Sequence, residues 1–354
     1  MPPSPNTNAP RILVTRLSAI GDCILTLPLV VALRRAMPQA LIAWAVERGP
    51  APLIEHHACV DHVIRVPKRV CGKPRELWAL RQQLRQWRFD LVLDPQALSK
   101  SAVLGYLSGA RRRISFRGPV GRELAPWLAS DLVTSVQPHV VDRYLELLKP
   151  LGCATSAAAN EVRFEIPQTA TAERAVHEFL NQPRLAGGFA VINPGAGWPT
   201  KLWPAERLGR IAHLLGEQAG VPTVVVWAGE EERRWAEQIV AAAPQHALLA
   251  PATSLLELAA VLRRARLFVG SDTGPLHLAA AVGVRCVGIY GPTRPEECGP
   301  YGAGHRVCQA YHQVASGRVK KFGPNDAMRA VTVEAVWQAC QEVLADAPCA
   351  VPAA

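Results

Sequence analysis

The sequence lacks several features that would assign it to a common class. No uninterrupted run of about 18 apolar residues, the length of a membrane-spanning helix, occurs in it, and the apolar run at residues 276–290 contains His277 and Arg285. Nine cysteines form no CxxC pair, which is typical of a reducing compartment rather than a disulfide framework. Residues 1–10 have neither the charged start nor the apolar core of a signal peptide. We therefore expect a cytoplasmic protein, soluble or peripheral to a membrane.

A metal centre is not expected either. The segment His56, His57, Cys59, Asp61 and His62 contains residue types that bind metals. No second ligand cluster with zinc-like spacing accompanies it, however.

Charged residues are few, and the positive ones are unevenly placed. They make up 19% of the 354 residues against 49% apolar residues, which indicates a globular protein of two domains. Residues 1–160 hold 21 Lys and Arg against 11 Asp and Glu, whereas residues 161–354 hold 18 of each. This basic half predicts an acidic partner, namely nucleic acid, an anionic membrane or a phosphorylated substrate; a merely solvated surface is the alternative.

Short β-rich runs alternate with helical periods along the whole chain, which predicts parallel sheets with crossover helices. The composition shifts over residues 150–185, where we place the junction of two doubly wound α/β domains. Ligands of such sheets bind at the carboxyl ends of the strands, so two facing domains would share one cleft. Strands are predicted at 11–16, 41–46, 63–66, 91–94, 189–193, 223–228, 247–249, 267–269 and 286–290, and helices at 22–37, 76–87 and 327–345.

The most informative segment reads LFVGSDTGPLH, residues 267–277. An apolar strand ends in a turn with Asp272, Thr273 and Gly274, and a helix of small residues begins there. Free N–H groups and the positive end of the helix dipole would then form a seat for an anion such as phosphate. The alternative is an ordinary turn in which Asp272 or Thr273 caps the helix.

Three further segments of the second half contain residues that could bind a nucleotide. Gly195 belongs to a glycine-rich loop after a predicted strand, and Lys201 follows it between aromatic and proline residues. A lysine there suits the neutralisation of a diphosphate, although it could also lie over Trp203 at the surface. Glu231 or Glu232, after the next strand, could accept the hydroxyl groups of a ribose or complement a helix dipole.

The first half has one comparable loop, SAIGD, at residues 18–22. Gly21 allows a tight turn, and Asp22 stands where a helix begins. Asp22 is either a helix cap or a carboxylate that takes a proton from an attacking hydroxyl group.

These segments together resemble the glycosyltransferase family that contains the lipopolysaccharide heptosyltransferases, glycosyltransferase family 9, and most of all heptosyltransferase I. The resemblance spans residues 11 to about 302. It rests on RLSAIGDCILTLPLVVALRRAMP, FDLVLDPQALSKSAVLGYLSGARRRISF, NPGAGWPTKLWP, TSLLELAAVLRRARLFVGSDTGPLHLAAAVGVRCVGIYGPT and GPYG. It implies a GT-B fold, with a tail at 1–10, an acceptor-binding Rossmann-like domain at 11–165, a nucleotide-sugar-binding Rossmann-like domain at 185–325, and a helix and tail at 326–354.

The resemblance also implies the roles of individual residues. Asp22 corresponds to the catalytic base, and Lys201 to the lysine that binds the donor diphosphate. The other expected donor-binding residues are Gly195, Glu232, Asp272, Thr273, Gly274 and His277. The expected acceptor-binding residues are Ser18, Gly21, Lys100, Arg111, Arg112 and Arg113, although the arginine triplet could instead be a solvated turn beside a strand.

The implied reaction is inverting, metal-independent transfer of a heptose from ADP-heptose to the anionic, lipid-linked Kdo/lipid A inner core. It needs no cofactor, and the enzyme would contact the cytoplasmic face of the inner membrane peripherally. Transfer of another sugar, or of a later core heptose, is the nearest alternative. Two alternatives lie outside this activity: a nucleotide-sugar binder without activity and a basic nucleic-acid binder. We expect no nucleic-acid partner, because the basic half shows no recognition helix or aromatic platform.

Overall fold

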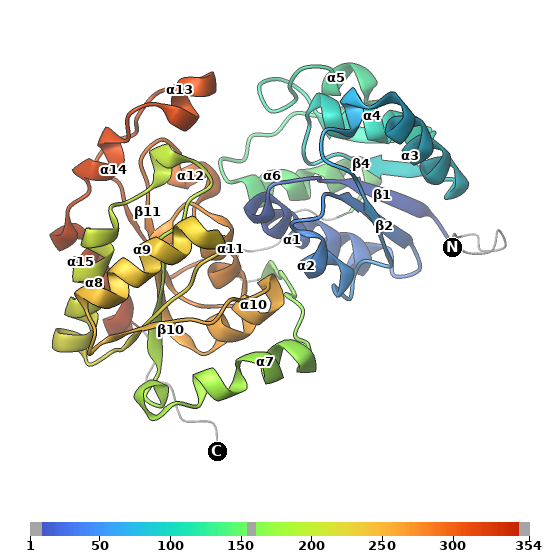
Figure 1. Cartoon of the computed structure of the whole chain (residues 1–354). Coiled ribbons are helices and arrows are strands. Elements are labelled where there is room, and N and C mark those ends of the chain that lie inside the picture. The colour runs from blue at the N-terminus through green and yellow to red at the C-terminus, as the bar shows by residue number, and fades with distance from the viewer. Residues whose placement is uncertain (1–8, 154–160, 347–354) are drawn as a thin grey trace. The chain divides into compact units, whose positions relative to one another are not determined.

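The computed structural model describes residues 9–153 and 161–346, so most of the tail expected at 1–10 lies outside the described residues. The chain divides into two compact units, Met1–Pro167 and Gln168–Ala354, which we call unit 1 and unit 2. Each unit contains a parallel sheet of six strands (Figure 1). The predicted doubly wound α/β fold is therefore confirmed.

Unit 1 has the strand order β3-β2-β1-β4-β5-β6, the order of a Rossmann fold. The central strands β1, β2 and β4 consist mostly of apolar residues because helices cover both faces of a parallel sheet. The strands are β1 (Arg11–Thr15), β2 (Leu41–Val46), β3 (His62–Arg65), β4 (Leu91–Leu93), β5 (Arg112–Phe116) and β6 (Asp131–Val133). The helices are α1 (Ile20–Ala36), α2 (Ala51–Glu55), α3 (Pro74–Gln86), α4 (Ser99–Ser108), α5 (Ala125–Leu128) and α6 (Val140–Leu145), with the 3-10 turns η1 (Val70–Gly72) and η2 (Glu146–Leu151).

The helix α3 shows how an amphipathic sequence covers this sheet. Leu80 and Leu84, four residues apart and therefore on one face of the helix, are buried. They pack in one cluster with Leu13 and Val92 of the sheet and Leu104 of α4. The helices α3, α4 and α5 follow one another over the sheet, α4 contacting both neighbours (Figure 1).

Unit 2 repeats this topology, with the order β12-β11-β10-β7-β8-β9. Helices α8, α9 and α15 cover a core that includes Ile192, Ile211, Ile239, Val269 and Val336. The strands are β7 (Phe189–Asn193), β8 (Thr223–Val225), β9 (Ala247–Leu249), β10 (Ala265–Ser271), β11 (Cys286–Ile289) and β12 (Arg306–Cys308). The helices are α7 (Ala170–Leu180), α8 (Ala205–Ala219), α9 (Gly229–Ala242), α10 (Leu255–Arg263), α11 (Gly274–Ala281), α12 (Pro295–Cys298), α13 (Gly317–Phe322), α14 (Asp326–Ala330) and α15 (Val333–Asp346), with the 3-10 turns η4 (Pro183–Leu185) and η5 (Pro199–Lys201).

The strand order determines where each unit can bind a ligand. In a doubly wound sheet, the crevice opens at the carboxyl ends of the two strands between which the order reverses. Those strands are β1 and β4 in unit 1, and β7 and β10 in unit 2. The loops that follow them, together with the first turns of the helices that begin there, carry most of the site residues expected from the sequence.

The single helix predicted at 327–345 is wrong, since α14 ends at Ala330 and α15 begins at Val333. The carbonyl oxygen of Val331 accepts hydrogen bonds from the indole of Trp203 and the guanidinium of Arg207. The hydroxyl group of Thr332 then accepts from the backbone N–H of Ala335, which favours a new helix start there.

The sequence-based prediction also missed three strands, β5, β6 and β12. Strand β5 begins with two arginines, which hide its apolar end, and β6 and β12 are three-residue strands at the sheet edges. Within residues 9–153 and 161–346, no helix combines the length and the apolar character needed to cross a bilayer.

Candidate functional site

The anion seat predicted in unit 2 lies between β10 and α11. Strand β10 ends at Ser271, and α11 begins at Gly274, with Pro275 in its first turn. Thr273 occupies the N-cap position with extended backbone, but its hydroxyl group donates to the carbonyl oxygen of Ser271 at 3.1 Å. None of the described side chains caps α11. The first backbone N–H groups and the positive end of the helix dipole are thus left open to a ligand.

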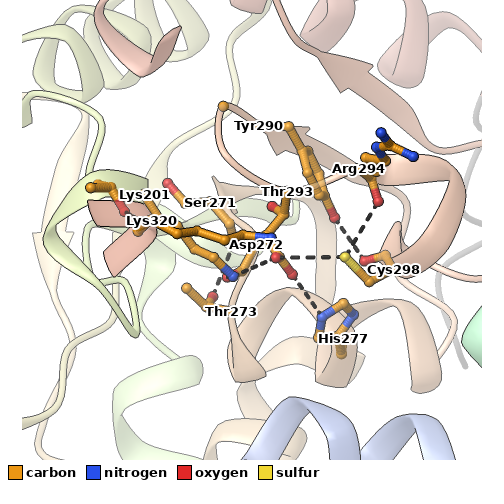
Figure 2. A network of polar contacts seen from close by, with 12 residues as sticks. Lys201, Ser271, Asp272, Thr273, His277, Tyr290, Thr293, Arg294, Cys298 and Lys320 are labelled. Carbon is orange, nitrogen blue, oxygen red and sulfur yellow. Dashed lines mark hydrogen bonds and ion pairs between the residues drawn. The ribbon is translucent and has the colours of Figure 1, made fainter. Parts of the chain in front are cut away.

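Asp272, beside this seat, lies at the centre of a buried polar network (Figure 2). The Nζ atom of Lys201 lies 2.5 Å from its Oδ2 atom, and the Nε2 atom of His277 lies 3.1 Å from its Oδ1 atom. Exposed fractions are only 7% for Asp272, 12% for Lys201 and 5% for His277. Burial opposes the charged carboxylate, yet the hydrogen bond from His277 and the charge of Lys201 hold the pKa of Asp272 well below its usual value.

Lys201 ends the 3-10 turn η5, which follows the glycine-rich loop after β7. Its ammonium group lies 4.4 Å from the ring centroid of Trp198, and that of Lys321 lies 5.3 Å from the same ring. The hydroxyl group of Thr200 donates to the carbonyl oxygen of Lys320 at 2.6 Å and so ties η5 to α13. The alternative of a surface lysine over Trp203 is not what the structure shows, because Lys201 points to Asp272.

Two further residues complete the network but were not predicted from the sequence. The thiol of Cys298 lies 3.7 Å from the Oδ2 atom of Asp272, and the hydroxyl group of Tyr290 donates to the carbonyl oxygen of Cys298 at 3.1 Å (Figure 2). Burial raises the pKa of Tyr290 well above its usual value. Neither residue was singled out from the sequence, and the contact between Cys298 and Asp272 joins positions that lie 26 residues apart.

Glu232 lies against the glycine-rich loop, as its expected role requires. One carboxylate oxygen accepts from the backbone N–H of Ala228 at 2.9 Å. A Cβ atom on Gly195 would lie 2.0 Å from the other oxygen, so only glycine leaves room for this carboxylate. Burial raises the pKa of Glu232, although hydrogen bonds from Ala228 and Asn193 oppose the shift. Glu231, the alternative residue, is exposed.

In unit 1, the carboxylate of Asp22 is held from two sides. Its Oδ1 atom lies 2.7 Å from the guanidinium of Arg16, and its Oδ2 atom accepts from the backbone N–H of Ala19 at 3.1 Å. Arg16 itself is 8% exposed; it also donates to the carbonyl oxygen of Pro95 and lies over the ring of Tyr144 at 5.3 Å. Asp22 is 46% exposed. A buried cation therefore orients a carboxylate that solvent can reach, in addition to its capping contact.

Lys100, in the first turn of α4, contacts the loop after β1. Its Nζ atom donates to the hydroxyl group of Ser18 at 2.7 Å and to Glu47 at 3.3 Å. Gly21 is buried in the first turn of α1, next to Asp22. The structure thus brings Ser18, Gly21, Asp22 and Lys100 together at the carboxyl ends of β1 and β4.

The arginine triplet lies elsewhere in unit 1. Arg112 pairs with Leu91, and Leu91 pairs with Ile12, so the triplet lies at the amino ends of these parallel strands, opposite the edge that carries Ser18. Arg112 binds Asp131 and the carbonyl oxygen of Pro150, and Arg113 binds the carbonyl oxygens of Ala110 and Leu128. The structure therefore separates Arg111, Arg112 and Arg113 from the other expected acceptor-binding residues. Arg112 and Arg113 belong to β5 itself and are hydrogen-bonded, so the predicted solvated turn beside a strand does not describe them.

In the histidine-rich segment of unit 1, His57 forms hydrogen bonds with backbone groups. The Nε2 atom of His57 lies 3.0 Å from the carbonyl oxygen of Phe164, and its Nδ1 atom accepts from the backbone N–H of Cys59. Within the part of the chain that the structure describes, no three His, Cys, Asp or Glu side chains gather as metal ligands do.

Two Rossmann-like units with polar loops at the carboxyl ends of their strands form the architecture of the GT-B class, and comparison with known proteins identifies the family. Residues 77–327 match the model of glycosyltransferase family 9 (heptosyltransferase), so the chain belongs to this family. It is 30% identical to lipopolysaccharide heptosyltransferase 1 of Escherichia coli O18:K1:H7 over 91% of this chain and 100% of that one. It is 31% identical to lipopolysaccharide heptosyltransferase 1 of Pseudomonas aeruginosa over 82% of this chain and 81% of that one.

A solved structure shares the fold. The structure of E. coli heptosyltransferase WaaC with ADP-2-deoxy-2-fluoro heptose matches with a TM-score of 0.74 and 28% identity, covering 94% of this chain and 99% of that one. The predicted GT-B fold and the predicted family are both confirmed.

Proposed function

We propose that this enzyme transfers a heptose from ADP-heptose to the Kdo/lipid A inner core of lipopolysaccharide, with inversion at the anomeric carbon and without a metal ion. Membership of the heptosyltransferase family supports the class of reaction. The observation that carries the proposal is the open amino end of α11 beside the buried Lys201 and Asp272 pair. A cation and free N–H groups at one place suit a diphosphate.

The donor binds to unit 2 in this proposal. The N–H groups at Thr273 and Gly274 and the ammonium of Lys201 contact the diphosphate, and Gly195 lets the backbone approach it closely. Glu232 accepts hydrogen bonds from the ribose hydroxyls. His277 contributes indirectly, because its buried ring binds the carboxylate of Asp272 through Nε2 at 3.1 Å and holds that carboxylate in place.

The acceptor binds to unit 1, and Asp22 acts as the general base. An acceptor hydroxyl oxygen attacks the anomeric carbon as the bond from that carbon to the phosphate oxygen breaks, and the carboxylate of Asp22 takes the hydroxyl proton. Arg16 is a positioning residue that fixes the carboxylate. Ser18 and Lys100 offer a hydroxyl group and a cation to the anionic acceptor.

The leaving ADP gains negative charge as the glycosidic bond to it breaks. Lys201 and the N–H groups at the amino end of α11 stabilise this charge in the role that a metal ion has in other transferases. The lipid-linked acceptor implies that the enzyme works peripherally at the cytoplasmic face of the inner membrane.

The test is a transfer assay with purified enzyme, ADP-heptose and Kdo-modified lipid A. We expect a product of inverted anomeric configuration, determined by NMR, and turnover that a chelator does not change. Asp22→Asn should abolish turnover while donor binding, measured by calorimetry, survives. Near-normal turnover of this variant would refute the base assignment.

The same assay distinguishes the alternative within the family. A panel of ADP-, GDP- and UDP-sugars, each offered with the unmodified and the monoheptosylated core, reports the preferred pair. Preference for the monoheptosylated core would assign the chain to the addition of a later heptose instead.

A further inference from the structure

Unit 1 exposes large apolar side chains at several places, and three of them lie on or beside α4 and α5. Trp127 of α5 is 84% exposed, Leu124, which precedes α5, is 55% exposed, and Tyr106 of α4 is 55% exposed. The guanidinium of Arg113 lies 5.7 Å from the ring of Tyr106 and donates to the carbonyl oxygen of Leu128, which ends α5. These residues therefore belong to one surface, which we call the α5 surface.

The α5 surface is held firmly rather than loosely attached. The backbone N–H of Leu124 donates to the hydroxyl group of Ser99, and the carboxylate of Glu123 accepts from the backbone N–H of Ser99. The backbone N–H of Arg122 donates to the carbonyl oxygen of Ala97, and Ala125 is completely buried. Since exposure of Trp127 costs free energy that this packing does not relieve, a partner outside unit 1 would be expected to cover it.

The charge around these apolar groups is positive. Arg117 and Arg122 are exposed on the segment that leads into α5. Glu123 is the acidic residue of that segment, and the hydrogen bonds from Ser99 hold its pKa below its usual value. Tryptophan and leucine among arginines is the combination that binds the interface of an anionic bilayer, where the ring lies at headgroup depth and the cations meet phosphate groups.

The amino end of α5 lies near the edge of the sheet where the proposed acceptor residues are, whereas Arg113 extends the α5 surface toward the opposite edge. Ser99, which binds Glu123 and Leu124, directly precedes Lys100, whose ammonium group binds Ser18. An acceptor anchored in a bilayer by its acyl chains must reach this edge. We propose that the α5 surface docks unit 1 onto an anionic phospholipid bilayer, with Trp127 and Leu124 inserted at the interface.

A second copy of the chain fits this surface less well. A symmetric contact would place this basic surface against the same basic surface of the other copy, whereas anionic phospholipids neutralise the arginines. The proposal extends the lipid-linked acceptor of the proposed function, but its test contains neither donor nor acceptor. Failure of the docking proposal would therefore not contradict the proposed transfer reaction. Failure of the transfer reaction would likewise not contradict docking to the bilayer.

The test is flotation of the full-length protein with vesicles of phosphatidylglycerol and phosphatidylethanolamine, compared with vesicles of phosphatidylcholine alone. We expect binding to the anionic vesicles only, weakened by added salt. The double variant Leu124→Ser/Trp127→Ser should bind about tenfold more weakly, and Arg122→Ser about fivefold more weakly. The matched control is Phe322→Ala in unit 2, because Phe322 is 65% exposed beside two lysines; it should bind like the unchanged protein.

Several results would overturn the proposal. These are no binding to anionic vesicles, equal binding to phosphatidylcholine, an unaffected double variant, or an equal loss in Phe322→Ala. A dimer in sedimentation equilibrium that the double variant converts to a monomer would assign the surface to self-association instead. If the double variant does not fold, the variant Trp127→Phe carries the test. Brominated lipids should quench the fluorescence of Trp127 in the unchanged protein, so the quenched fraction of the total tryptophan fluorescence should be smaller in Trp127→Phe.

Discussion

Lys201 has two roles in our interpretation, and a pair of substitutions separates them. It neutralises the buried carboxylate of Asp272 at 2.5 Å, and we propose that it also binds the donor diphosphate. Lys201→Met keeps the length of the side chain and removes the charge. We therefore expect this variant to lose both stability in unit 2 and catalytic turnover.

The magnitude of the stability loss follows from the contacts of Asp272. Removal of one partner from a buried ion pair typically costs about 3–5 kcal/mol, because the other charge stays in a poorly solvated place. His277 still donates to the Oδ1 atom of Asp272, so the loss should lie near the low end, about 3 kcal/mol. Asp272→Asn removes the buried negative charge, so in the double variant Lys201→Met/Asp272→Asn most of this loss should be recovered.

Hydrogen exchange of the backbone amides in β10 and α11, resolved by mass spectrometry, measures the local free energy of opening. Turnover and donor affinity are measured on the same preparations. We expect stability to recover in the double variant while turnover stays about a hundredfold below normal, the usual effect of removing one preorganised donor.

Two results would refute this reasoning. Unchanged protection in Lys201→Met would mean that the ion pair does not stabilise unit 2. Recovery of turnover together with stability in the double variant would mean that Lys201 acts only through Asp272, and the diphosphate contact would be withdrawn.

Three further predictions concern the other parts of the site. Arg16→Lys keeps a buried cation but loses the planar guanidinium that orients Asp22, so turnover should fall about tenfold. Donor affinity, measured by calorimetry, should not change. An equal fall in donor affinity would contradict a role of Arg16 confined to Asp22. Gly195→Ala places a methyl group against the carboxylate of Glu232. The free energy of unfolding, measured by urea denaturation, should fall by about 1–3 kcal/mol, and ADP should bind more weakly. Normal ADP affinity would argue against the ribose contact. Because the pKa of Asp272 is depressed in the folded state, its contribution to the free energy of unfolding should be constant above about pH 5 and decline as the pH falls below about 4; an identical acid dependence in Asp272→Asn would exclude this contribution.

Much of the fold could be predicted because its signals are local. Each apolar strand is buried on both faces and so reads as a continuous hydrophobic run, as in residues 189–193 and 223–225. The strands β5, β6 and β12 escaped prediction because only pairing with neighbouring strands makes such short or charged segments into strands. The division of the final helix likewise depends on Trp203 and Arg207, more than 120 positions earlier in the chain.

The candidate site likewise has parts with a local signal in the sequence and parts that depend on contacts between distant residues. Segments that follow a strand and contain candidate residues, such as Asp22, Gly195 and Thr273, can be located from the sequence because strand, turn and helix start succeed one another within a few residues. The roles of these residues came from the family resemblance and stay predictions. The arginine triplet shows the limit, because a cluster of charges in the sequence does not reveal which edge of the sheet carries it. Register settles that question: Arg112 lies opposite Leu91, at the amino end of the strands.

By itself, the sequence determined the family, the two α/β units and the segments that carry the candidate residues, because these depend on residue order within short segments. Only the tertiary structure decided that Arg16 holds Asp22, that Lys201 and His277 share Asp272, and that Trp127 is exposed beside arginines. These contacts join residues distant in the chain, and their strength comes from burial and charge in a common environment, which no local pattern encodes.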